Sequence, residues 1–354
     1  MTTSMHELTR PLVVDLDGTL IRTDLLVESA SQFLIQHPFQ FFKPLLWLLR
    51  GKTVLKTELA QRVHLDVSSL PYNRDVIEWL QLQKRQGRRL VLATASHRVL
   101  AEQVAQHLHL FDEVLATEGD TNLKATAKTN ALVARYGEGG YDYMGNDWPD
   151  LKVWAKAHTA HVVGASASLM ASAQAQGHVG EVWPNPAPST LMSLLKAMRL
   201  HQWMKNLLVF VPLMAAHQYG DAQRDVLALM AFVVFSLTAS SVYLLNDLVD
   251  VQDDRHHARK RNRPFASGAL SLITGWAAWP ALLLVAVVLS AWLMPVLFSV
   301  SLGVYFVLTV AYSLQLKQLA VVDVLTLAAL YTLRIIAGAA AIAVAVSFWL
   351  LLFS

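Results

Sequence analysis

The spacing of apolar and polar residues differs between the two halves of the chain. In the first half, short apolar runs end in polar clusters and are separated by helical stretches, a pattern typical of buried strands alternating with helices. In the second half, the apolar runs reach the length that a helix needs to cross a bilayer. The expected spans are Leu200–Ala216, Val226–Leu245, Ile273–Leu293, Val296–Leu314 and Val322–Val346, with a sixth beginning at Phe348.

A proline-rich segment separates the halves. Trp183–Pro188 holds three prolines, and Gly164–Gly177 before it is rich in Ala and Ser, so regular structure should end there. We therefore predict two domains. Residues 1–188 should form a doubly wound α/β domain with its site at the carboxyl ends of parallel strands, and residues 189–354 an all-α, multi-helix transmembrane bundle.

Charge follows the same division. From Lys196 onward there are 11 Lys and Arg against 7 Asp and no Glu, so the second half is poor in charge. The net charge of +3 is too small to indicate a nucleic-acid partner. The chain has no cysteine, which excludes disulfides and thiolate chemistry and fits a cytoplasmic first half. No cleavable signal is visible, because the first apolar run, Pro11–Leu16, is short and interrupted by Asp15.

The densest cluster of charges, Asn246–Pro264, follows the uncharged run Val226–Leu245 and therefore lies at a membrane surface. If the helix continues, Asp247, Asp250 and Asp254 share one face at positions i, i+3 and i+7. A divalent cation such as Mg²⁺ would turn their repulsion into binding. Basic residues follow at once and offer donors for phosphate oxygens, among them Lys260 and Arg263. The alternative is a juxtamembrane loop whose basic residues obey the positive-inside rule and whose acids neutralise them.

A second acidic pair ends the first predicted strand. Asp15 and Asp17 stand two residues apart in DLDGT, so both project in one direction, where they can share a cation and one can attack a phosphoryl group. This DxDGT sequence resembles motif I of the haloacid dehalogenase-like hydrolases. The resemblance implies a phosphatase in which Asp15 is the nucleophile and Asp17 the general acid/base, both being metal ligands.

Later segments resemble the other motifs of that family. Thr94 follows the apolar run Arg89–Ala93 and corresponds to the hydroxyl that binds a phosphate oxygen, with Ser96 as the less favoured choice. Lys128 corresponds to the conserved lysine, and Lys124 competes with it. In YDYMGNDWPD, Asp150 corresponds to the distal metal carboxylate.

One position departs from the pattern. The usual acid after the glycine is replaced by Asn146, and Asp147 follows one place late. Either cation affinity is reduced or Asp147 substitutes, so the resemblance supports the fold more strongly than the phosphatase activity.

The insertion of about residues 25–73 is expected to form a helical cap over this site. Its segment Pro38–Arg50 is strongly apolar and aromatic, with Lys43, Arg50 and Lys52 close by. Two interpretations remain open: a cap packed on its own core, or a helix lying on the membrane surface.

The second half resembles the UbiA prenyltransferase superfamily. Asn246, Asp247, Asp250 and Asp254 match its first aspartate motif, NDxxDxxxD, and KRNRPFASG continues it. HQWMKN resembles the opening of that family's first helix, which implies that Lys205 faces a phosphate-bearing pocket.

A second acidic motif of this family usually holds paired aspartates, but here only Asp323 is available, with Lys317 before it. Arg334 lies inside an expected span, where a charge is costly, and we expect it to pair with Asp323. This combination looks most like the branch that moves phosphoribose onto polyprenyl phosphate. The metal set implied by the resemblance is Asn246, Asp247, Asp250, Asp254 and Asp323, and the implied phosphate ligands are Lys205, Lys260, Arg263 and Lys317.

The resemblances imply an integral membrane protein of the inner (plasma) membrane, with the soluble domain cytoplasmic. It would use Mg²⁺, a polyprenyl phosphate or diphosphate, and a diphosphate-bearing or aromatic co-substrate. The sixth span is too short to cross, so we expect the C-terminal helices of the bundle to be lacking. Three hypotheses follow: a prenyl or phosphoribosyl transferase with a fused phosphatase, an aromatic-acceptor prenyltransferase, or a non-catalytic fragment with a regulatory or docking soluble domain.

Overall fold

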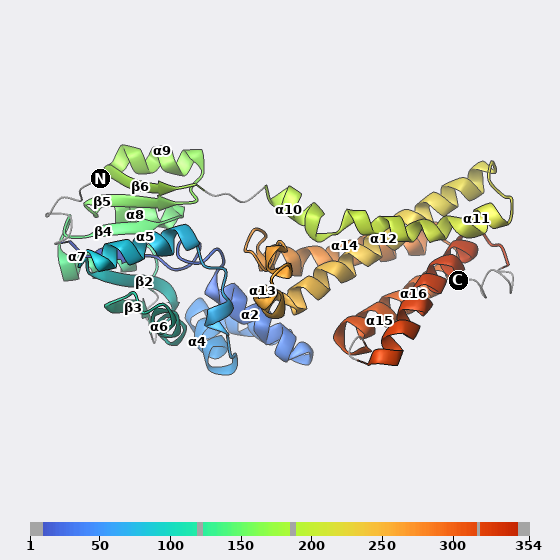
Figure 1. Ribbon diagram of the computed structural model, residues 1–354, viewed down its shortest axis with the longest axis horizontal. Helices are drawn as coiled ribbons and strands as arrows, with labels where there is room; N and C mark the ends of the chain where they lie inside the picture. Colours follow the sequence, from blue (N-terminus) through green and yellow to red (C-terminus); the bar gives the residue numbers. More distant parts are fainter. Residues whose placement is uncertain (1–9, 119–122, 185–188, 317–318, 346–354) are drawn as a thin grey trace. The chain divides into compact units, whose positions relative to one another are not determined.

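The structure, a computed structural model, describes residues 10–118, 123–184, 189–316 and 319–345 (Figure 1). The chain divides into two units. The first comprises Met1–Pro188 together with two later segments, Gln252–Asn262 and Ala266–Leu272. The second comprises Ser189–Val251, Arg263–Phe265 and Ile273–Ser354. The expected boundary at residue 188 thus coincides with the end of the first unit's main segment, but the two later segments were not expected in that unit.

The first unit contains a parallel sheet of six strands in the order β3-β2-β1-β4-β5-β6. This is a doubly wound order, in which the strand sequence reverses beside β1, so the predicted fold class is confirmed. The strands are β1 (Leu12–Val14), β2 (Leu90–His97), β3 (Glu113–Thr117), β4 (Asp142–Gly145), β5 (Thr159–Val163) and β6 (His178–Trp183).

Alternate residues of the central strands enter two separate cores. Leu12 and Val14 pack on one face of the sheet with α5 and α6, whereas Val13 packs on the other face with α7, α8 and α9. This follows from the two-residue period of a strand. The helices are α5 (Arg74–Arg85), α6 (Arg98–Leu108), α7 (Thr126–Tyr136), α8 (Leu151–Trp154) and α9 (Ala167–Gln176).

The insertion between β1 and β2 is helical, as expected. Asp24 caps its first helix by accepting hydrogen bonds from the Leu26 and Val27 amides. A small core of its own forms around Phe33 and Trp47. The insertion contains α2 (Leu25–Gln36), α3 (Lys43–Arg50) and α4 (Lys52–Arg62), with short 3₁₀ turns η1 (Pro38–Gln40) and η2 (Val67–Ser69).

The later segments of the first unit carry most of α13 (Val251–His256) and the turn η5 (Lys260–Asn262). Within this unit the Arg255 guanidinium donates to both carboxylate oxygens of Glu28, at 2.6 and 3.1 Å, and both side chains are buried. A buried, bidentate pair of this kind is strongly oriented.

The second unit contains four helices that are long and apolar enough to cross a membrane, among the residues described. They are α12 (Ala222–Val249), α14 (Leu272–Leu293), α15 (Val296–Leu314) and α16 (Ala320–Ala341), preceded by α10 (Thr190–Ala197), the 3₁₀ helix η4 (Leu200–Phe210) and α11 (Val211–Ala215). The expected bounds of α15 are matched. The expected α-helical first span, Leu200–Ala216, is wrong, because a 3₁₀ helix occupies most of it. The expected sixth span lies outside the described residues.

Close backbone packing joins η4 to α16. A Cβ atom on Gly338 would lie 2.0 Å from the Val209 carbonyl oxygen, so only glycine fits at this crossing. The buried cluster around Phe235 and Tyr305 then fills the space between α12, α15 and α16. The glycine therefore fixes where α16 presents its polar residues.

Candidate active sites

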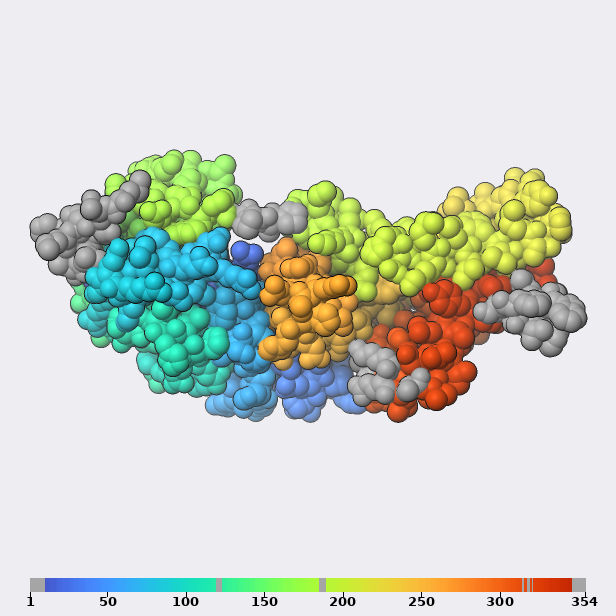
Figure 2. All heavy atoms as spheres, viewed as in Figure 1, coloured from blue at the N-terminus to red at the C-terminus, as the bar shows by residue number. Residues whose placement is uncertain are grey.

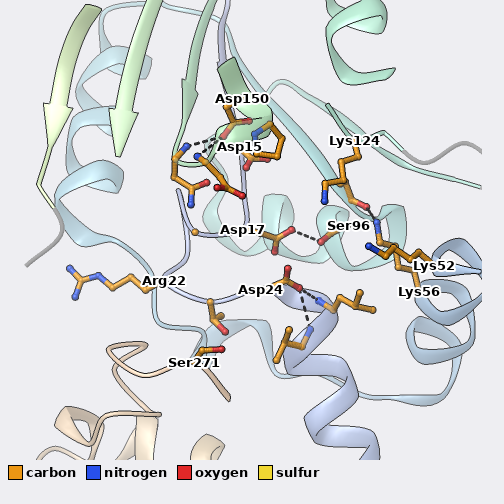
Figure 3. Close-up of a pocket in the computed structure, with 18 of the residues that line it drawn as sticks. Asp15, Asp17, Arg22, Asp24, Lys52, Lys56, Ser96, Lys124, Asp150 and Ser271 are labelled. Atoms are coloured by element: carbon orange, nitrogen blue, oxygen red, sulfur yellow. Dashed lines mark hydrogen bonds between the residues drawn. The ribbon is translucent and has the colours of Figure 1, made fainter. Parts of the chain in front are cut away.

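The first unit has a cavity of about 500 Å³ at the carboxyl ends of β1, β2 and β4. This is where ligands bind in doubly wound folds. Figure 3 shows the acidic side chains converging on the cavity, with lysines on one side and Ser271 on another. The residues that line this cavity include Asp15, Asp17, Ser96, Lys128, Asn146 and Asp150.

A buried chain of polar contacts begins at Asp15. The Lys128 ammonium donates to Asp15 Oδ1 at 2.7 Å and to the Tyr143 hydroxyl at 2.9 Å. Tyr143 in turn donates to Asp150 Oδ1 at 2.8 Å. Since Lys128 binds one oxygen of Asp15, the other can attack. The geometry therefore selects Lys128 over Lys124 as the lysine that contacts Asp15.

Asp17 is held by the start of the cap and by β2. Its Oδ1 accepts from the Leu25 amide at 2.8 Å, and its Oδ2 accepts from the Ser96 hydroxyl at 2.7 Å. The Thr94 hydroxyl lies 3.4 Å from the same oxygen and accepts from the Ser96 amide at 3.0 Å. Thr94 is fully buried, whereas Ser96 lines the cavity. The structure thus favours Ser96 over Thr94 as the hydroxyl that could contact a phosphate oxygen, although the sequence favoured Thr94. The reason is that β2 continues to His97 and Thr94 is buried within it.

Burial shapes the acidity of this pair. Burial raises the pKa of Asp15 to about 6, although the Lys128 ammonium acts in the opposite direction. Burial raises the pKa of Asp17 to about 7, and the nearby Asp24 and Asp15 carboxylates add to the rise. Burial lowers the pKa of Lys128, but Asp15 and Asp150 more than offset it, so that pKa ends above its usual value. At neutral pH, a sizeable fraction of Asp17 is therefore protonated and can donate a proton.

The expected metal carboxylate Asp150 is committed to the loop that follows β4. Its Oδ2 accepts from the amides of Asn146 at 2.9 Å and Asp147 at 3.1 Å. It therefore orders the loop, and its role as a ligand stays a prediction.

The substituted position, Asn146, contacts motif I. The Thr19 hydroxyl donates to its carboxamide oxygen at 3.1 Å. A Cβ atom on Gly18 would lie 2.2 Å from the Asn146 amide nitrogen, so the glycine leaves room for this contact.

The donor set fits a magnesium ion through two carboxylates. Asp15 is a buried and Asp17 a partly buried carboxylate, and both line the cavity, so their oxygens are available as ligands. Mg²⁺ commonly uses one or two protein carboxylates, several waters and substrate phosphates. Among the described residues, no three His, Cys, Asp or Glu side chains are grouped closely enough to hold a metal ion. Asp15 and Asp17, with the Asn146 carboxamide, are therefore the residues that would hold it.

Three cations that the motifs did not indicate also line the cavity, namely Arg22, Lys52 and Lys56, together with the alternative motif lysine Lys124. Lys56 donates to the Ala95 carbonyl oxygen at 2.5 Å, and burial lowers its pKa. The cap therefore supplies positive charge to the acidic site. The only signal in the sequence was the row of basic residues from Lys43 to Lys56, which periodicity alone could not place.

The second unit has a smaller cavity, of about 230 Å³, between η4, α12, α15 and α16. Three cations line it: Arg199, the expected Lys205, and Arg334. The other polar residues that line it are Tyr243, Asn246, Tyr305, Thr309, Tyr312, Ser313 and Tyr331. Cationic and hydroxyl donors around a cavity of this size suit an anion such as a phosphate.

Arg334 does not pair with Asp323, so that expectation is wrong. The two residues stand eleven positions apart on α16, a rise of about 16 Å. Asp323 instead accepts from the Tyr312 hydroxyl at 2.7 Å. Arg334 is buried and donates to Asn206 at 3.0 Å, to the Leu330 carbonyl and to the Tyr305 hydroxyl at 3.3 Å. Within the part of the chain described, it makes no ion pair with a carboxylate.

The aspartates after the second span do not share one helical face, because α12 ends at Val249 and Asp250 takes the cap position. Asp247 is buried and accepts from Arg199 at 2.6 Å and from Arg263 at 3.1 Å. Asn246 donates to Asp250 at 3.1 Å. The carboxylate oxygens of Asp247 and Asp250 fit Mg²⁺ as ligands. The Asp247 carboxylate, however, already accepts hydrogen bonds from two guanidinium groups.

The remaining predicted ligands are spread over the chain. Asp254 belongs to the first unit, where it is buried and lies 4.0 Å from the Lys260 ammonium. Arg263 belongs to the second unit, where it donates to the Asp247 carboxylate. Lys317 lies outside the described residues. Their roles toward metal or phosphate stay predictions.

Both halves match models of known families. Residues 12–138 match haloacid dehalogenase-like hydrolase, and residues 206–354 match the UbiA prenyltransferase family. The chain therefore joins a haloacid dehalogenase-like region to a UbiA region, which confirms both resemblances. With its four apolar helices, it is an integral membrane protein.

The chain is also similar in sequence to three individual proteins. It is 33% identical to the uncharacterized protein y4nM of Sinorhizobium fredii over 97% of this chain and 66% of that protein. It is 37% identical to the decaprenyl-phosphate phosphoribosyltransferase of Mycobacterium tuberculosis over 49% of this chain and 58% of the enzyme. It is 41% identical to the nodulation protein NoeC of Azorhizobium caulinodans over 42% of this chain and 48% of that protein. The chain thus spans about half to two thirds of these relatives.

Two solved structures overlap about half of the chain. A phosphoserine phosphatase in apo form is 13% identical, with a TM-score of 0.36, and covers 50% of this chain and 94% of its own. A Bordetella pertussis protein of unknown function is 14% identical, with a TM-score of 0.38, and covers 49% of this chain and 97% of its own.

Proposed function

We propose that this protein transfers a phosphoribosyl group from a diphosphate donor to a polyprenyl phosphate in its second unit and removes phosphate at Asp15 in its first. The observation that carries the transferase proposal is Arg334, a buried cation without an acidic partner among the described residues, which lines one cavity with Lys205 and Arg199. Such a cavity suits a phosphate-bearing substrate. The relatives named as phosphoribosyltransferases support this choice over prenyl transfer.

The aspartates beside that cavity would assist departure of diphosphate. Asp247 and Asp250 would hold Mg²⁺, which would neutralise the charge that develops on the leaving group. Arg199 and Arg263 contact Asp247 and lie where they can donate to phosphate oxygens. The lipid phosphate would then form a bond to the sugar carbon as the carbon–oxygen bond to diphosphate breaks.

In the first unit, the proposed step is hydrolysis of a phosphate monoester. The oxygen of Asp15 that does not contact Lys128 attacks phosphorus, and Asp17 gives a proton to the departing ester oxygen. Water then attacks the aspartyl phosphate while Asp17 takes up a proton, which releases inorganic phosphate. Ser96 and Lys128 orient the two carboxylates, and Asp15 and Asp17 would hold Mg²⁺, which would offset the charge of the phosphoryl group.

This order of steps implies a location. Phosphoribosyl diphosphate and inorganic phosphate are solutes of the cytoplasm, so we place the first unit there and the helices in the inner (plasma) membrane. The cationic stretch Arg255–Arg263 after α12 accords with the positive-inside rule.

A second candidate function is favoured by Asn146. Its neutral carboxamide stands at the position of the usual acid and is held by Thr19. A first unit that binds phosphate without hydrolysing it would then regulate or dock the second. Prenyl transfer to an aromatic acceptor is the corresponding alternative for the second unit.

A donor screen tests the transferase proposal. Vesicles containing the protein and Mg²⁺ receive either polyprenyl phosphate with 5-phosphoribosyl diphosphate, or polyprenyl diphosphate with an aromatic acid. We expect diphosphate release and a sugar-bearing lipid only with the first pair, and loss of both with Arg334→Gln. Glu138→Gln, a change in an exposed ion pair of the first unit, is the control. A prenylated aromatic product, or no product with either pair, would contradict the proposal.

A further inference from the structure

The cap of the first unit exposes a large apolar surface formed by Phe39, Phe41, Phe42, Leu45 and Leu49, here called the cap apolar surface. Phe39 is 91% exposed and Leu49 is 77% exposed. The neighbouring Leu46 and Leu48 are also exposed. In Figure 2, cap atoms in the blue part of the colour scale form part of the visible surface. A contiguous apolar surface of this kind marks an interaction site in proteins that do not aggregate.

This surface is not an unfinished core, because the cap already has one. Trp47 is the inward residue of α3 and meets the Phe33 ring edge-on, with centroids 5.1 Å apart. The Arg62 guanidinium lies 5.3 Å from the Trp47 ring and covers it. Trp47 thus fixes the rotation of α3, and the residues around it point outward by consequence. Of the two interpretations left open by the sequence, a cap packed only on its own core does not account for these exposed side chains.

The segment that carries the cap apolar surface has charges of one sign only. Residues 38–57 contain Lys43, Arg50, Lys52 and Lys56 and no Asp or Glu. Cations that flank exposed Phe and Leu side chains are the composition of helices that lie in the interface of a bilayer containing anionic lipids. A bilayer is present in the protein's own setting, because the same chain has four apolar helices that are long enough to span one.

The same short helix reaches the cavity that holds Asp15. Leu48 of α3 and Leu26 and Val27 of α2 line that cavity, and Lys52 and Lys56 line it as well. Leu48, which precedes Leu49 on α3, therefore brings an apolar side chain of the cap to the wall of the cavity that holds Asp15. The phosphate ester of a small polar metabolite has no apolar part to contact these side chains, whereas a lipid-linked phosphate has one.

We propose that the cap apolar surface inserts into the interface of the membrane and that a lipid-linked phosphate reaches Asp15 along Leu48. Lys43 and Arg50 would contact anionic head groups, and Lys52 and Lys56 would contact the phosphate to be removed. The choice of substrate rests on the proposed phosphatase activity, whereas the insertion of the surface does not.

Insertion can be measured without any activity, because the chain has no cysteine and accepts a single label. Phe39→Cys and Leu49→Cys carry an environment-sensitive fluorophore in the full chain, reconstituted in nanodiscs that contain anionic lipid. Lipids with a nitroxide at a shallow acyl position should quench both labels at least several-fold more than a label at Leu82→Cys. Leu82 of α5 is the matched control, since it is an apolar residue 48% exposed outside the cap.

Equal quenching at all three positions would overturn the insertion, and so would labels at Phe39→Cys that report contact between two copies of the chain instead of lipid. The result holds whether or not the protein hydrolyses phosphate, so failure of the proposed function is seen separately.

A second experiment tests the route of the substrate. The triple variant Phe39→Ser, Leu45→Ser, Leu49→Ser should hydrolyse para-nitrophenyl phosphate as the parent does, since none of these residues lines the cavity. On a polyprenyl-linked phosphate in vesicles, its turnover should fall at least tenfold. An equal loss on both substrates, or no loss on either, would contradict the route.

Discussion

At the residue scale, burial affects the pKa values of the acidic site more than the neighbouring charges do. Asp15 and Asp17 have raised pKa values chiefly because burial disfavours their charged forms. The DLDGT sequence indicated the pair, since it ends a strand. It could not indicate that Ser96, and not Thr94, lines the cavity, because this depends on how far β2 continues. Nor could it indicate Lys56, which reaches the site from the cap.

His161 is a buried histidine whose titration should be visible in stability. It lies on β5 against the Trp79 ring, with centroids 5.0 Å apart, and its Nδ1 accepts from the Glu181 amide at 3.0 Å. Burial lowers the pKa of His161 from 6.5 to about 4. Between these pH values the unfolded chain binds more protons than the folded one, so stability falls as pH decreases from 6.5 to 4 and is unaffected above 6.5.

The prediction is a loss on the order of 3 kcal/mol at pH 4 relative to pH 7 from this one group. The measurement is the free energy of unfolding of the first unit in the detergent-solubilised chain, followed by circular dichroism at several pH values. His161→Gln, whose amide oxygen can still accept from Glu181, should remove that part of the slope. Identical slopes for parent and variant would count against a buried neutral histidine.

At the element scale, the two strands named from the sequence and the long apolar helices are present, most of them with shifted ends. The expectation that regular structure ends in Gly164–Gly177 is wrong, because α9 and then β6 follow β5 there. The bounds Val296–Leu314 were matched because the run has no charged residue and is flanked by Pro295 and Gln315. The helix through Asp247 and Asp250 was expected to continue, but it breaks at Asp250, and hydrophobic periodicity carries no signal for such a break among polar residues. The 3₁₀ helix η4 was also missed, since its apolar content is that of an α-helix.

One contact that ties β4 to the start of β2 should dominate the stability of the sheet. Asp142 on β4 and Arg88 form a salt bridge in which both side chains are buried. Arg88 also donates to Gln83 at 3.0 Å. Replacing Asp142 by Asn leaves a buried guanidinium without its counter-charge, which costs about 3–5 kcal/mol.

The matched control is Glu138→Gln, since Glu138 pairs with Lys156 at 2.7 Å on the surface and such pairs contribute about 0–1 kcal/mol. Urea unfolding of the solubilised chain compares the two variants. A similar small loss for both would show that the buried pair does not stabilise the sheet more than a surface pair does.

At the scale of the whole molecule, the two-part organisation was readable because each half has its own hydrophobic pattern. The first unit, however, is not one stretch of sequence. It includes residues 252–262 and 266–272, and Gly268, Leu270 and Ser271 from them line the cavity that holds Asp15. Interactions between residues so far apart leave no periodic signal, so no single-sequence pattern predicts them. The same holds for the cavity of the second unit, where Lys205 was expected but Arg199 was not.

In the proposed function, Asp15 removes a phosphate group from a polyprenyl-linked compound. The most direct test supplies a polyprenyl-phosphoryl ribose 5-phosphate in vesicles with Mg²⁺ and follows inorganic phosphate. We expect the parent to release phosphate, Asp15→Asn to release it at least about 10³-fold more slowly, and Glu138→Gln to behave as the parent does. Equal release by the parent and Asp15→Asn, or none by either, would contradict it.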